Sequence, residues 1–404
     1  MVVTVAVIST AEIAKAKVIP ALESSSTAAS LVAVSSRDKK RAQAFINENC
    51  CSSSKRDNDA YENNERVVVG MTHDEVLSSA ASIDAVYVPL PSRVRNDMLR
   101  NAIHHGKHIY SEKPHGGSIQ EFKSILDLAQ AKNLQWMDGT MWYHSNRTKA
   151  MEEQRQCLGN VRRVSASFTW GGGGLVDTDW IEGGNGRTDP KRERMGMLGD
   201  SGHYPISAAA WAFGWKLPWK VQATHTKFNS VGAIVECEAV LWFENGGRAI
   251  IDTSCLLPHR SQFEMVCEKG VLKVDDLVGG QGRSGNFGAY EGPFVGSSSF
   301  VMGDYLGKDT IINAQACDHV QSLVNAFSQC VETIQKGGKA DPEWSKRSLI
   351  THTIMCAVFE SAMRSGTSIE LRKNSDSASE EYEYIIDGAA FDDLPTMAWE
   401  KNES

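Results

Sequence analysis

The chain opens with VVTVAVISTAEIA, residues 2–14, an apolar, β-branched run that leads directly into a turn of small residues. Such a run predicts a buried strand, and residues 11–22 carry the apolar spacing of a helix. Residues 31–35 are strand-like again, so the chain begins with a strand-helix-strand unit. We therefore expect a parallel sheet that starts at residue 2.

Strand and helix patterns continue to alternate as far as about residue 140. Further buried-strand candidates lie at residues 66–69, 84–89, 108–111 and 134–138, with helical patterns at residues 94–105 and 119–132. This alternation is typical of a doubly wound, nucleotide-binding Rossmann domain, which we assign to residues 1–140. Residues 47–65 are polar with almost nothing apolar to bury, and they predict a solvated insertion loop.

The pattern changes after residue 148. Strand-like segments follow one another at residues 161–169, 221–226, 235–243, 248–254, 262–268 and 270–274. Short turns favour a mainly antiparallel open sheet, partly covered by helices at residues 318–336 and 345–364. The sequence thus predicts an α/β protein with a second, α+β domain for substrate binding and oligomerisation over residues 141–404, where the tail from about residue 375 is peripheral.

Composition disfavours several classes of protein. The 404 residues carry a formal net charge of −8, which argues against a nucleic-acid partner because such proteins cluster Lys and Arg. No apolar run is long enough to span a membrane, and the N-terminus lacks the pattern of a signal peptide. The nine cysteines have no zinc-ligand spacing, and His104, His105 and His108 fall on a helix end and the next strand. We expect a cytoplasmic protein with reduced thiols, no membrane contact and no metal site.

The turn after the first strand is the candidate site for the pyrophosphate of a dinucleotide. A Rossmann turn follows the pattern G-x-G-x-x-G, whereas this chain has Ser9 and Ala11 in place of the first two glycines. Both residues are small, and the hydroxyls of Ser9 and Thr10 could bond phosphate. We expect cofactor contacts from Ser9, Thr10, Ala11 and Ile13. The alternative is a small-residue turn in an α/β domain that binds no nucleotide.

The end of the second strand bears on the choice between NAD and NADP. An NAD site usually has an acidic residue here, but this chain has Ser35-Ser36-Arg37. A hydroxyl followed by a guanidinium suits a 2'-phosphate, so Ser36 and Arg37 favour NADP as the cofactor, with NAD as the alternative. Arg37 could instead belong, with the basic residues at 39–41, to the solvated face of the next helix.

Residues 106–114 read GKHIYSEKP, and this window resembles the GKHVxxEKP signature of the Gfo/Idh/MocA family of oxidoreductases. Other windows similar to family motifs follow in the family's order: VYVPLPS at 86–92, MDGTMWYH at 137–144, NGRTDP at 185–190 and GDSGHYP at 199–205. The resemblance covers roughly residues 2–372. The chain departs from the family pattern at Ser9 and Ala11, at Arg95 where many members have His, and at Tyr143 in place of a frequent Arg.

The resemblance implies a catalytic set of Lys113, Asp200 and Tyr204, with His203 as a competing assignment for the acid/base. A phenol titrates with a pKa of about 10, so Tyr204 needs a nearby cation to favour the phenolate at neutral pH. Lys113 is the expected cation, and its ammonium would also stabilise a developing alkoxide. Asp200 and Tyr204 are four residues apart, which places both on one side of a helix start.

The resemblance also implies where cofactor and substrate lie. Besides the turn and Ser36-Arg37, the residues expected to contact the cofactor are Leu90, Pro91, Arg95, Glu112 and Lys113. Those expected to line the substrate pocket are Trp142, Tyr143, His144, Arg187, Asp200 and Tyr204. The implied activity is NAD(P)-dependent oxidation or reduction of a small-molecule sugar, polyol or diol. An open second sheet also needs covering, so we expect a homodimer or higher homo-oligomer.

Two other functions remain open. The missing glycines suit a non-catalytic dinucleotide-binding regulatory or scaffold protein of the same fold. A third candidate is an enzyme that retains its cofactor tightly for another reaction, such as glycoside cleavage through transient oxidation.

Overall fold

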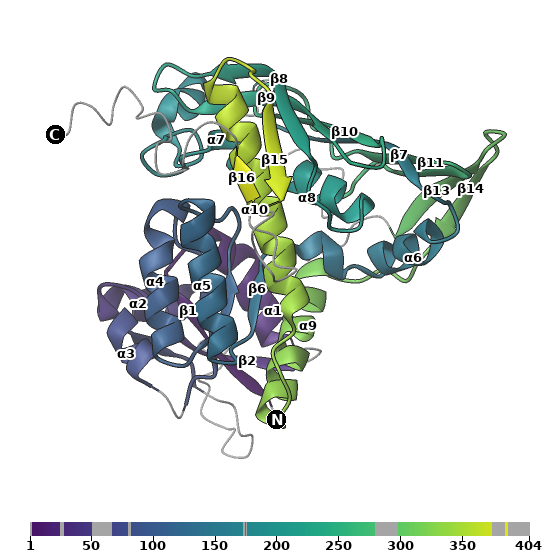
Figure 1. The fold of residues 1–404 in the computed structure, drawn as a ribbon. Helices are drawn as coiled ribbons and strands as arrows, with labels where there is room; N and C mark the ends of the chain where they lie inside the picture. The colour runs from purple at the N-terminus through teal and green to yellow at the C-terminus, as the bar shows by residue number, and fades with distance from the viewer. Residues whose placement is uncertain are drawn as a thin grey trace.

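The computed structural model describes residues 2–24, 28–50, 67–79, 82–172, 174, 176–278, 298–373 and 384–386. Two sheets lie in separate bodies, with the long helix α10 (Pro342–Met363) between them (Figure 1). Most of the expected insertion loop at 47–65 and most of the tail beyond residue 375 fall outside the described residues.

The first sheet is parallel throughout and has the strand order β3-β2-β1-β4-β5-β6. Its strands are β1 (Val3–Ile8), β2 (Ala29–Ser35), β3 (Val69–Met71), β4 (Ala85–Val88), β5 (His108–Ser111) and β6 (Trp136–Asp138). The predicted doubly wound fold is confirmed, and the strand order reverses at β1. Only the third strand was placed wrongly: it begins at Val69 instead of residue 66, and Val67 is exposed.

Helices cover both faces of this sheet. They are η1 (Ala14–Val18), a π-helical turn that continues into α1 (Ile19–Glu23), then α2 (Lys39–Asn49), α3 (His73–Ser78), α4 (Ser92–His104) and α5 (Ile119–Ala131). Helical residues begin at residue 12, one residue later than the apolar spacing predicted, and η1 follows them. Residues 9–11 form the turn that follows β1.

The second sheet contains ten described strands in the order β14-β13-β12-β11-β7-β10-β9-β8-β15-β16. Their bounds are β7 (Val161–Thr169), β8 (Lys220–Phe228), β9 (Ile234–Trp242), β10 (Arg248–Ser254), β11 (Phe263–Cys267), β12 (Gly270–Val274), β13 (Ser299–Asp304), β14 (Asp309–Asn313), β15 (Ile369–Lys373) and β16 (Tyr384–Ile386). Only the pair β7 and β10 is parallel among these neighbours. The mainly antiparallel sheet is therefore confirmed.

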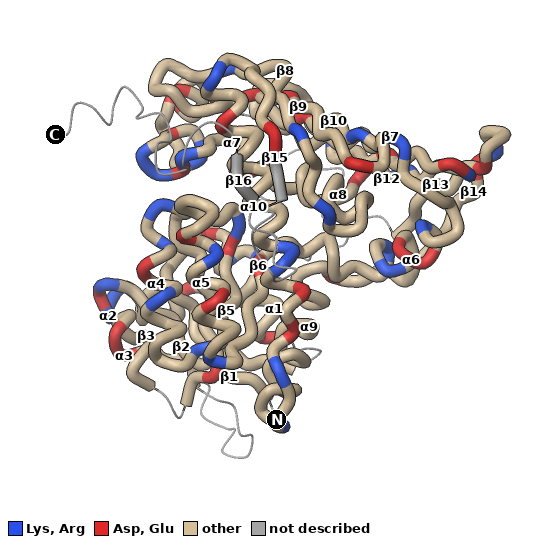
Figure 2. Tube along the Cα trace, viewed as in Figure 1, with Lys and Arg blue, Asp and Glu red and all other residues tan. Residues whose placement is uncertain are grey.

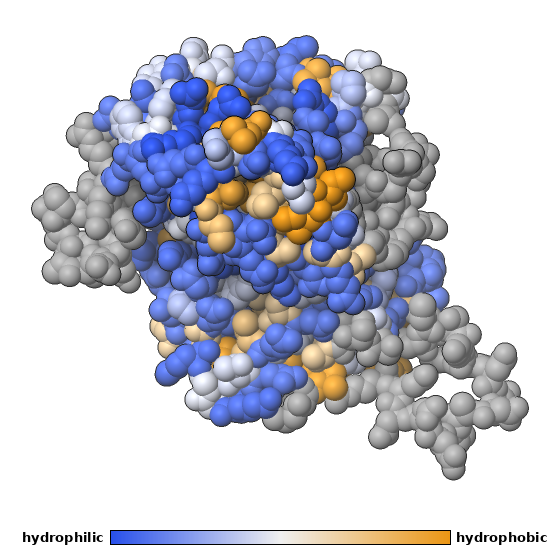
Figure 3. Space-filling model, turned by 90° about the vertical axis from the view of Figure 1, so that its right-hand side faces the viewer, coloured by the Kyte–Doolittle hydropathy of each residue, from blue (hydrophilic) through white to orange (hydrophobic). Residues whose placement is uncertain are grey.

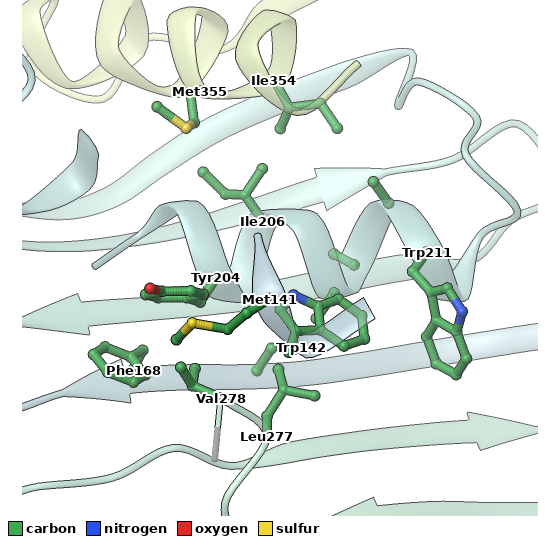
Figure 4. Packing of buried hydrophobic residues seen from close by; sticks show 14 of the residues in the cluster. Met141, Trp142, Phe168, Tyr204, Ile206, Trp211, Leu277, Val278, Ile354 and Met355 are labelled. Carbon is green, nitrogen blue, oxygen red and sulfur yellow. The ribbon is translucent and has the colours of Figure 1, made fainter. Parts of the chain in front are cut away.

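One face of the second sheet packs on α7 (Gly196–Asp200), α8 (His203–Ala212) and α10. Every residue of α8 is buried. Figure 4 shows how Met141 and Trp142, from the short helix η3 (Met141–His144), lie between Ile206 of α8 and the strands. The Trp142 indole N–H donates to Ser207 Oγ at 3.1 Å, so its one polar group is satisfied inside the core.

The helix α9 (His319–Gln335) does not cover the second sheet as expected. Its apolar face, which includes Leu323 and Phe327, packs against β1, β2 and α1 of the Rossmann body, as Figure 1 also shows. The Ala28 N–H donates to Asn325 Oδ1 at 3.0 Å across this contact. The chain thus returns to the first body, because that sheet has apolar residues on both faces and η1 and α1 cover only part of one. The domain division at residue 140 stays a prediction.

None of the described helices is long and apolar enough to cross a membrane. The described residues also contain no group of three or more His, Cys, Asp or Glu side chains placed to hold a metal ion.

Candidate active site

Lys113, Asp200 and Tyr204 come together where the two bodies meet. The Lys113 ammonium donates to the Asp200 backbone carbonyl at 2.7 Å and to Asp200 Oδ1 at 3.0 Å. The same nitrogen lies 4.7 Å from the centre of the Tyr204 ring. Lys113 follows β5, Asp200 ends α7 and Tyr204 lies in the first turn of α8. The side chains expected to be catalytic are therefore neighbours, although 87 residues separate Lys113 from Asp200.

Ion pairing keeps Lys113 and Asp200 charged although both side chains are largely buried. Burial alone would raise the pKa of Asp200, but Lys113 and Arg187 outweigh it and lower this pKa to about 2. Burial alone would lower the pKa of Lys113, but the Asp200 carboxylate, with Tyr204 and Glu112, outweighs it and raises this pKa above its usual value. At neutral pH the site therefore contains an ammonium and a carboxylate.

Tyr204 differs from what the sequence predicted. Its ring is 8% exposed, and burial raises the pKa of its phenol above the ordinary value, while the opposing effect of Lys113 is smaller. The expected phenolate at neutral pH is therefore wrong for the protein alone: Tyr204 carries its proton. A neutral phenol beside an ammonium is a hydrogen-bond donor to a substrate oxygen.

His203, the competing assignment, has its ring centre 6.0 Å from that of Tyr204, but its hydrogen bond is made inside the core. Its Nε2 atom is 2.7 Å from Thr140 Oγ1, and the side chain is 1% exposed. Burial lowers its pKa to about 3, so the ring is neutral. It belongs to a buried polar layer with His115 and His352. The geometry favours Tyr204 over His203 as the residue that can reach a substrate held by Lys113.

Arg95 is buried next to the site and binds backbone carbonyls there. Its side chain is 3% exposed, and it donates to the carbonyls of Leu90 and Pro114 at 2.7 Å each and also to the carbonyl of Glu112. The contact of Arg95 with the cofactor stays a prediction; in the protein alone its guanidinium binds backbone on both sides of Lys113. Arg95 thus links the loop after β4 to the loop after β5. This link fixes the position of the backbone on either side of Lys113.

Glu193 was missed by the sequence analysis. It lies 9% exposed in the segment before α7, and burial raises its pKa to about 7, against the opposing effects of Ser92 and Arg95. Glu112 is the second acid near Arg95; it accepts from the Tyr87 hydroxyl at 2.7 Å, and burial raises its pKa. Nothing in the sequence marks Glu193, since it stands within the basic run Lys191-Arg192-Glu193-Arg194, which predicts a solvated surface.

Three of the expected substrate residues belong to the core. Trp142 has no exposed surface, Tyr143 packs edge-on against Trp215, and His144 stacks on Trp344 with 4.7 Å between ring centres. Their proximity in sequence to the signature windows does not bring them to Lys113, because η3 turns them into the packing between the bodies. Arg187 does reach the site: its Nε lies 3.1 Å from Asp200 Oδ2, and its side chain is 49% exposed.

The turn after β1 lies at the edge of the sheet where Rossmann folds bind dinucleotides. Ser9 has φ of 131°, a backbone conformation that favours glycine, and its N–H donates to the Ser35 carbonyl at 3.0 Å. Ile13 is 39% exposed beside it. Ser9, Thr10, Ala11, Ser36, Arg37, Leu90 and Pro91 all follow the carboxyl ends of β1, β2 and β4. Open α/β sheets bind ligands at this edge where the strand order reverses, so these residues fit a dinucleotide.

Comparisons with known proteins agree with this geometry. Residues 3–140 match the model of an oxidoreductase family with an NAD-binding Rossmann fold, and residues 153–273 match the GFO/IDH/MocA C-terminal domain. A D-xylose 1-dehydrogenase (NADP(+)) of Haloferax volcanii is 26% identical over 367 residues, which cover 90% of this chain and 98% of the relative.

Two solved structures share the fold. A 3-ketoreductase from Actinomadura kijaniata, in complex with NADP and TDP-benzene, has a TM-score of 0.67 at 22% identity, over 88% of this chain and 96% of that chain. An aldose-aldose oxidoreductase from Caulobacter crescentus has a TM-score of 0.69 at 17% identity, over 92% and 100% of the two chains. The chain therefore belongs to the Gfo/Idh/MocA family of oxidoreductases: residues 3–140 are that family's NAD-binding Rossmann domain, and residues 153–273 match its C-terminal domain.

Proposed function

We propose that this protein is an NADP-dependent dehydrogenase or reductase that interconverts a secondary alcohol and its carbonyl on a sugar, polyol or diol. The observation that carries the proposal is the buried group of Lys113, Asp200 and Tyr204 beside the nucleotide-binding edge of the sheet. The Haloferax relative, whose name gives both a sugar and NADP(+), supports the substrate class and the cofactor.

Each residue has a distinct role in this proposal. When bound, a nicotinamide cofactor supplies the hydride donor or acceptor. Tyr204 donates its O–H to the oxygen of a carbonyl substrate during reduction and is left as the phenolate; in the reverse direction the phenol must first release its proton to solvent, and the phenolate then takes up the hydroxyl proton of the alcohol. The Lys113 ammonium stabilises negative charge on that oxygen. Asp200 holds Lys113 through two acceptors, and it also pairs with Arg187, which remains half-exposed for contact with the substrate.

The choice of NADP rests on the end of β2. Ser36 and Arg37 stand where an acidic residue would bind the ribose of NAD, and a hydroxyl with a guanidinium suits a phosphate instead. The NADP in the Actinomadura ketoreductase structure and in the name of the Haloferax relative agrees with this choice.

Nucleotide binding tests the proposal before any substrate is known. NADPH and NADH are titrated separately against the fluorescence of the ten tryptophans, with the wild type, Arg37→Ala and the control Arg41→Ala on the exposed side of α2. We expect Arg37→Ala to weaken NADPH binding about tenfold to a hundredfold, as for lost hydrogen bonds to a charged group, and to leave NADH binding unchanged. A protein that binds neither nucleotide would contradict the proposed activity.

A screen of aldoses, polyols and diols with the preferred nucleotide then gives the substrate. Turnover that disappears in Lys113→Ala would exclude the scaffold alternative, for which the strained Ser9 turn is the one favourable observation. Nucleotide that remains bound through purification would favour the third candidate, an enzyme with a resident cofactor.

We also propose a homodimer formed through the face of the second sheet that none of the described helices covers. On β10, Ala249 and Ile251 point toward the helices and are fully buried, whereas Ile250 is 40% exposed on the opposite face. Trp219 is 40% exposed before β8, and Figure 3 shows apolar side chains gathered among polar ones on the side seen from the right of Figure 1. Sedimentation of the wild type and Ile250→Glu tests this: a monomeric wild type would contradict it.

A further inference from the structure

A histidine that the sequence analysis did not predict lies beside the expected 2'-phosphate position. His73 begins α3, directly after β3, and its Nδ1 is 2.8 Å from Ser35 Oγ at the end of β2. The Ser36 N–H donates to the Met71 carbonyl at 3.1 Å, which ties the ends of β2 and β3 together. His73 and the Ser36-Arg37 pair therefore occupy adjacent strand ends at one edge of the sheet.

The hydrogen bonds around Ser35 fix how the imidazole is oriented. The Ser35 hydroxyl can donate to the Val7 carbonyl at 3.3 Å, and in that arrangement its oxygen accepts from Nδ1 of His73 at 2.8 Å. Nε2 of His73 then has no partner among the residues that the structure describes, and the side chain is half-buried. In the neutral ring this Nε2 is an acceptor, whereas in the imidazolium it is a donor. In that arrangement only the imidazolium can donate to a phosphate oxygen, and in either arrangement of the Ser35 hydroxyl only the imidazolium adds a positive charge there.

The charges around His73 favour an anion between it and Arg37. Burial lowers the pKa of His73, Asp74 raises it, and the positive charge of Arg37 lowers it further. Lys39 on α2 is engaged elsewhere, since it pairs with Glu75 of α3 at 3.0 Å. Figure 2 shows basic and acidic segments next to each other on α2 and α3. Glu75 also accepts from the Thr72 N–H at 2.8 Å. Arg37 and protonated His73 therefore repel each other until an anion binds to both.

We propose that His73 is a third ligand, with Ser36 and Arg37, for a phosphate monoester on the adenosine ribose, and that its imidazolium form sets the preference for NADP over NAD. The inference rests on the proposed nicotinamide-dependent function. It makes His73 a residue that determines which of the two nucleotides binds. NADH lacks the phosphate, so its binding does not depend on His73.

The proposal makes NADPH affinity depend on pH with a defined sign. A bound phosphate dianion raises the pKa of His73 relative to the free protein, so NADPH binding takes up a proton. Affinity is then highest below the pKa of the free protein and falls as pH rises toward the pKa of the complex. The second ionisation of a phosphate monoester, with a pKa of about 6, acts in the opposite direction. The comparison of variants at the same pH isolates the contribution of His73.

The experiment measures dissociation constants of NADPH and NADH at pH 6.5 and 8.5 by tryptophan fluorescence. The proteins are the wild type, His73→Gln, His73→Arg and the control His105→Gln, which changes an exposed histidine at the end of α4. We expect His73→Gln to weaken NADPH binding about tenfold at pH 6.5 and much less at pH 8.5, with NADH unchanged. His73→Arg should keep the preference for NADPH at both pH values, because its charge does not titrate.

The other outcomes are equally definite. If His73→Gln binds NADPH as the wild type does at both pH values, the inference is wrong while the NADP-dependent function stands. If His73→Gln and His73→Arg weaken the binding of NADPH and NADH equally, His73 only stabilises the structure at this edge of the first sheet, and the inference is again wrong. If the wild type binds neither nucleotide, the proposed function fails and the inference fails with it.

Discussion

The two ends of the site are held in different ways. At the chemical end, Lys113 and Asp200 are buried ionised groups that satisfy each other, and Arg95 binds the backbone on either side of Lys113. At the nucleotide end, Ser9 and Ala11 stand where the Rossmann pattern has glycine, yet Ser9 takes a glycine-like backbone conformation. A backbone shape can be kept by another small residue at a cost in strain, whereas a buried ammonium has no substitute among neutral side chains. The nucleotide end therefore tolerates a change that the chemical end would not.

Acid should destabilise the fold next to the chemical end, because the core there contains the buried neutral histidines His203 and His352. Burial lowers the pKa of His203 and His352 to about 3, well below the ordinary value near 6.5 that they regain on unfolding. The unfolded chain binds more protons below pH 6.5, so stability is lost as pH falls from 6.5 toward 3. At pH 5 each such histidine should cost about 2 kcal/mol of unfolding free energy.

Urea unfolding at pH 7.5 and pH 5 measures this loss. Glu193 acts in the opposite direction: its raised pKa of about 7 means that its contribution improves as pH falls, by about 2 kcal/mol over the same interval. His203→Gln, which cannot titrate, should therefore lose about 2 kcal/mol less than the wild type between the two pH values. An equal loss in both proteins would show that His203 is not neutral and buried in the native state.

Lys113→Met should separate chemistry from binding. The loss of an ammonium that stabilises a developing alkoxide typically costs a factor of about a thousand, so we expect kcat/KM to fall by about that much on the substrate found by screening. The dissociation constant of NADPH should change by less than about tenfold, because the turn after β1 and the end of β2 hold most of the nucleotide. Lys346→Met, on the exposed side of α10, is the control and should leave both quantities unchanged. Loss of NADPH binding in Lys113→Met, with kcat unaffected, would show that Lys113 binds the nucleotide and does not take part in the chemical step.

The features predicted correctly are those that a short stretch of sequence reveals by its residue types and their spacing. Parallel strands buried on both faces read as continuous β-branched runs, so β1, β2 and β4 were found within a few residues. The signature windows brought out Lys113, Asp200 and Tyr204, which the fold then places side by side. These features depend on residue type and on short spacing, and both are visible in a single sequence.

The errors concern burial and long-range packing. The spacing of α9 shows that it has an apolar face, but not which of the two sheets that face covers. Arg95 is a cation in the sequence; only the fold shows that three carbonyls surround it. The proton on Tyr204 was misjudged for the same reason, since burial outweighs the nearby ammonium. No local pattern encodes how far a side chain lies from water.

Ser9 offers the finest test of the comparison. A non-glycine residue held at φ of 131° typically costs about 1–3 kcal/mol, and glycine would remove that strain while giving the unfolded chain about 0.5–1 kcal/mol more entropy. Ser9→Gly should therefore raise the unfolding free energy by about 1 kcal/mol, measured by urea denaturation. Ser9→Ala keeps the strain and removes only the hydroxyl, so its stability should match that of the wild type.

Nucleotide binding by the same two variants shows what the serine is for. If its hydroxyl bonds the pyrophosphate, both Ser9→Ala and Ser9→Gly should weaken NADPH about fivefold, as expected for one neutral hydrogen bond. If the backbone alone matters, both should bind as the wild type does. Tighter binding by Ser9→Gly alone would mean that the Ser9 side chain obstructs the nucleotide. Serine at this position would then bind the cofactor less well than glycine does.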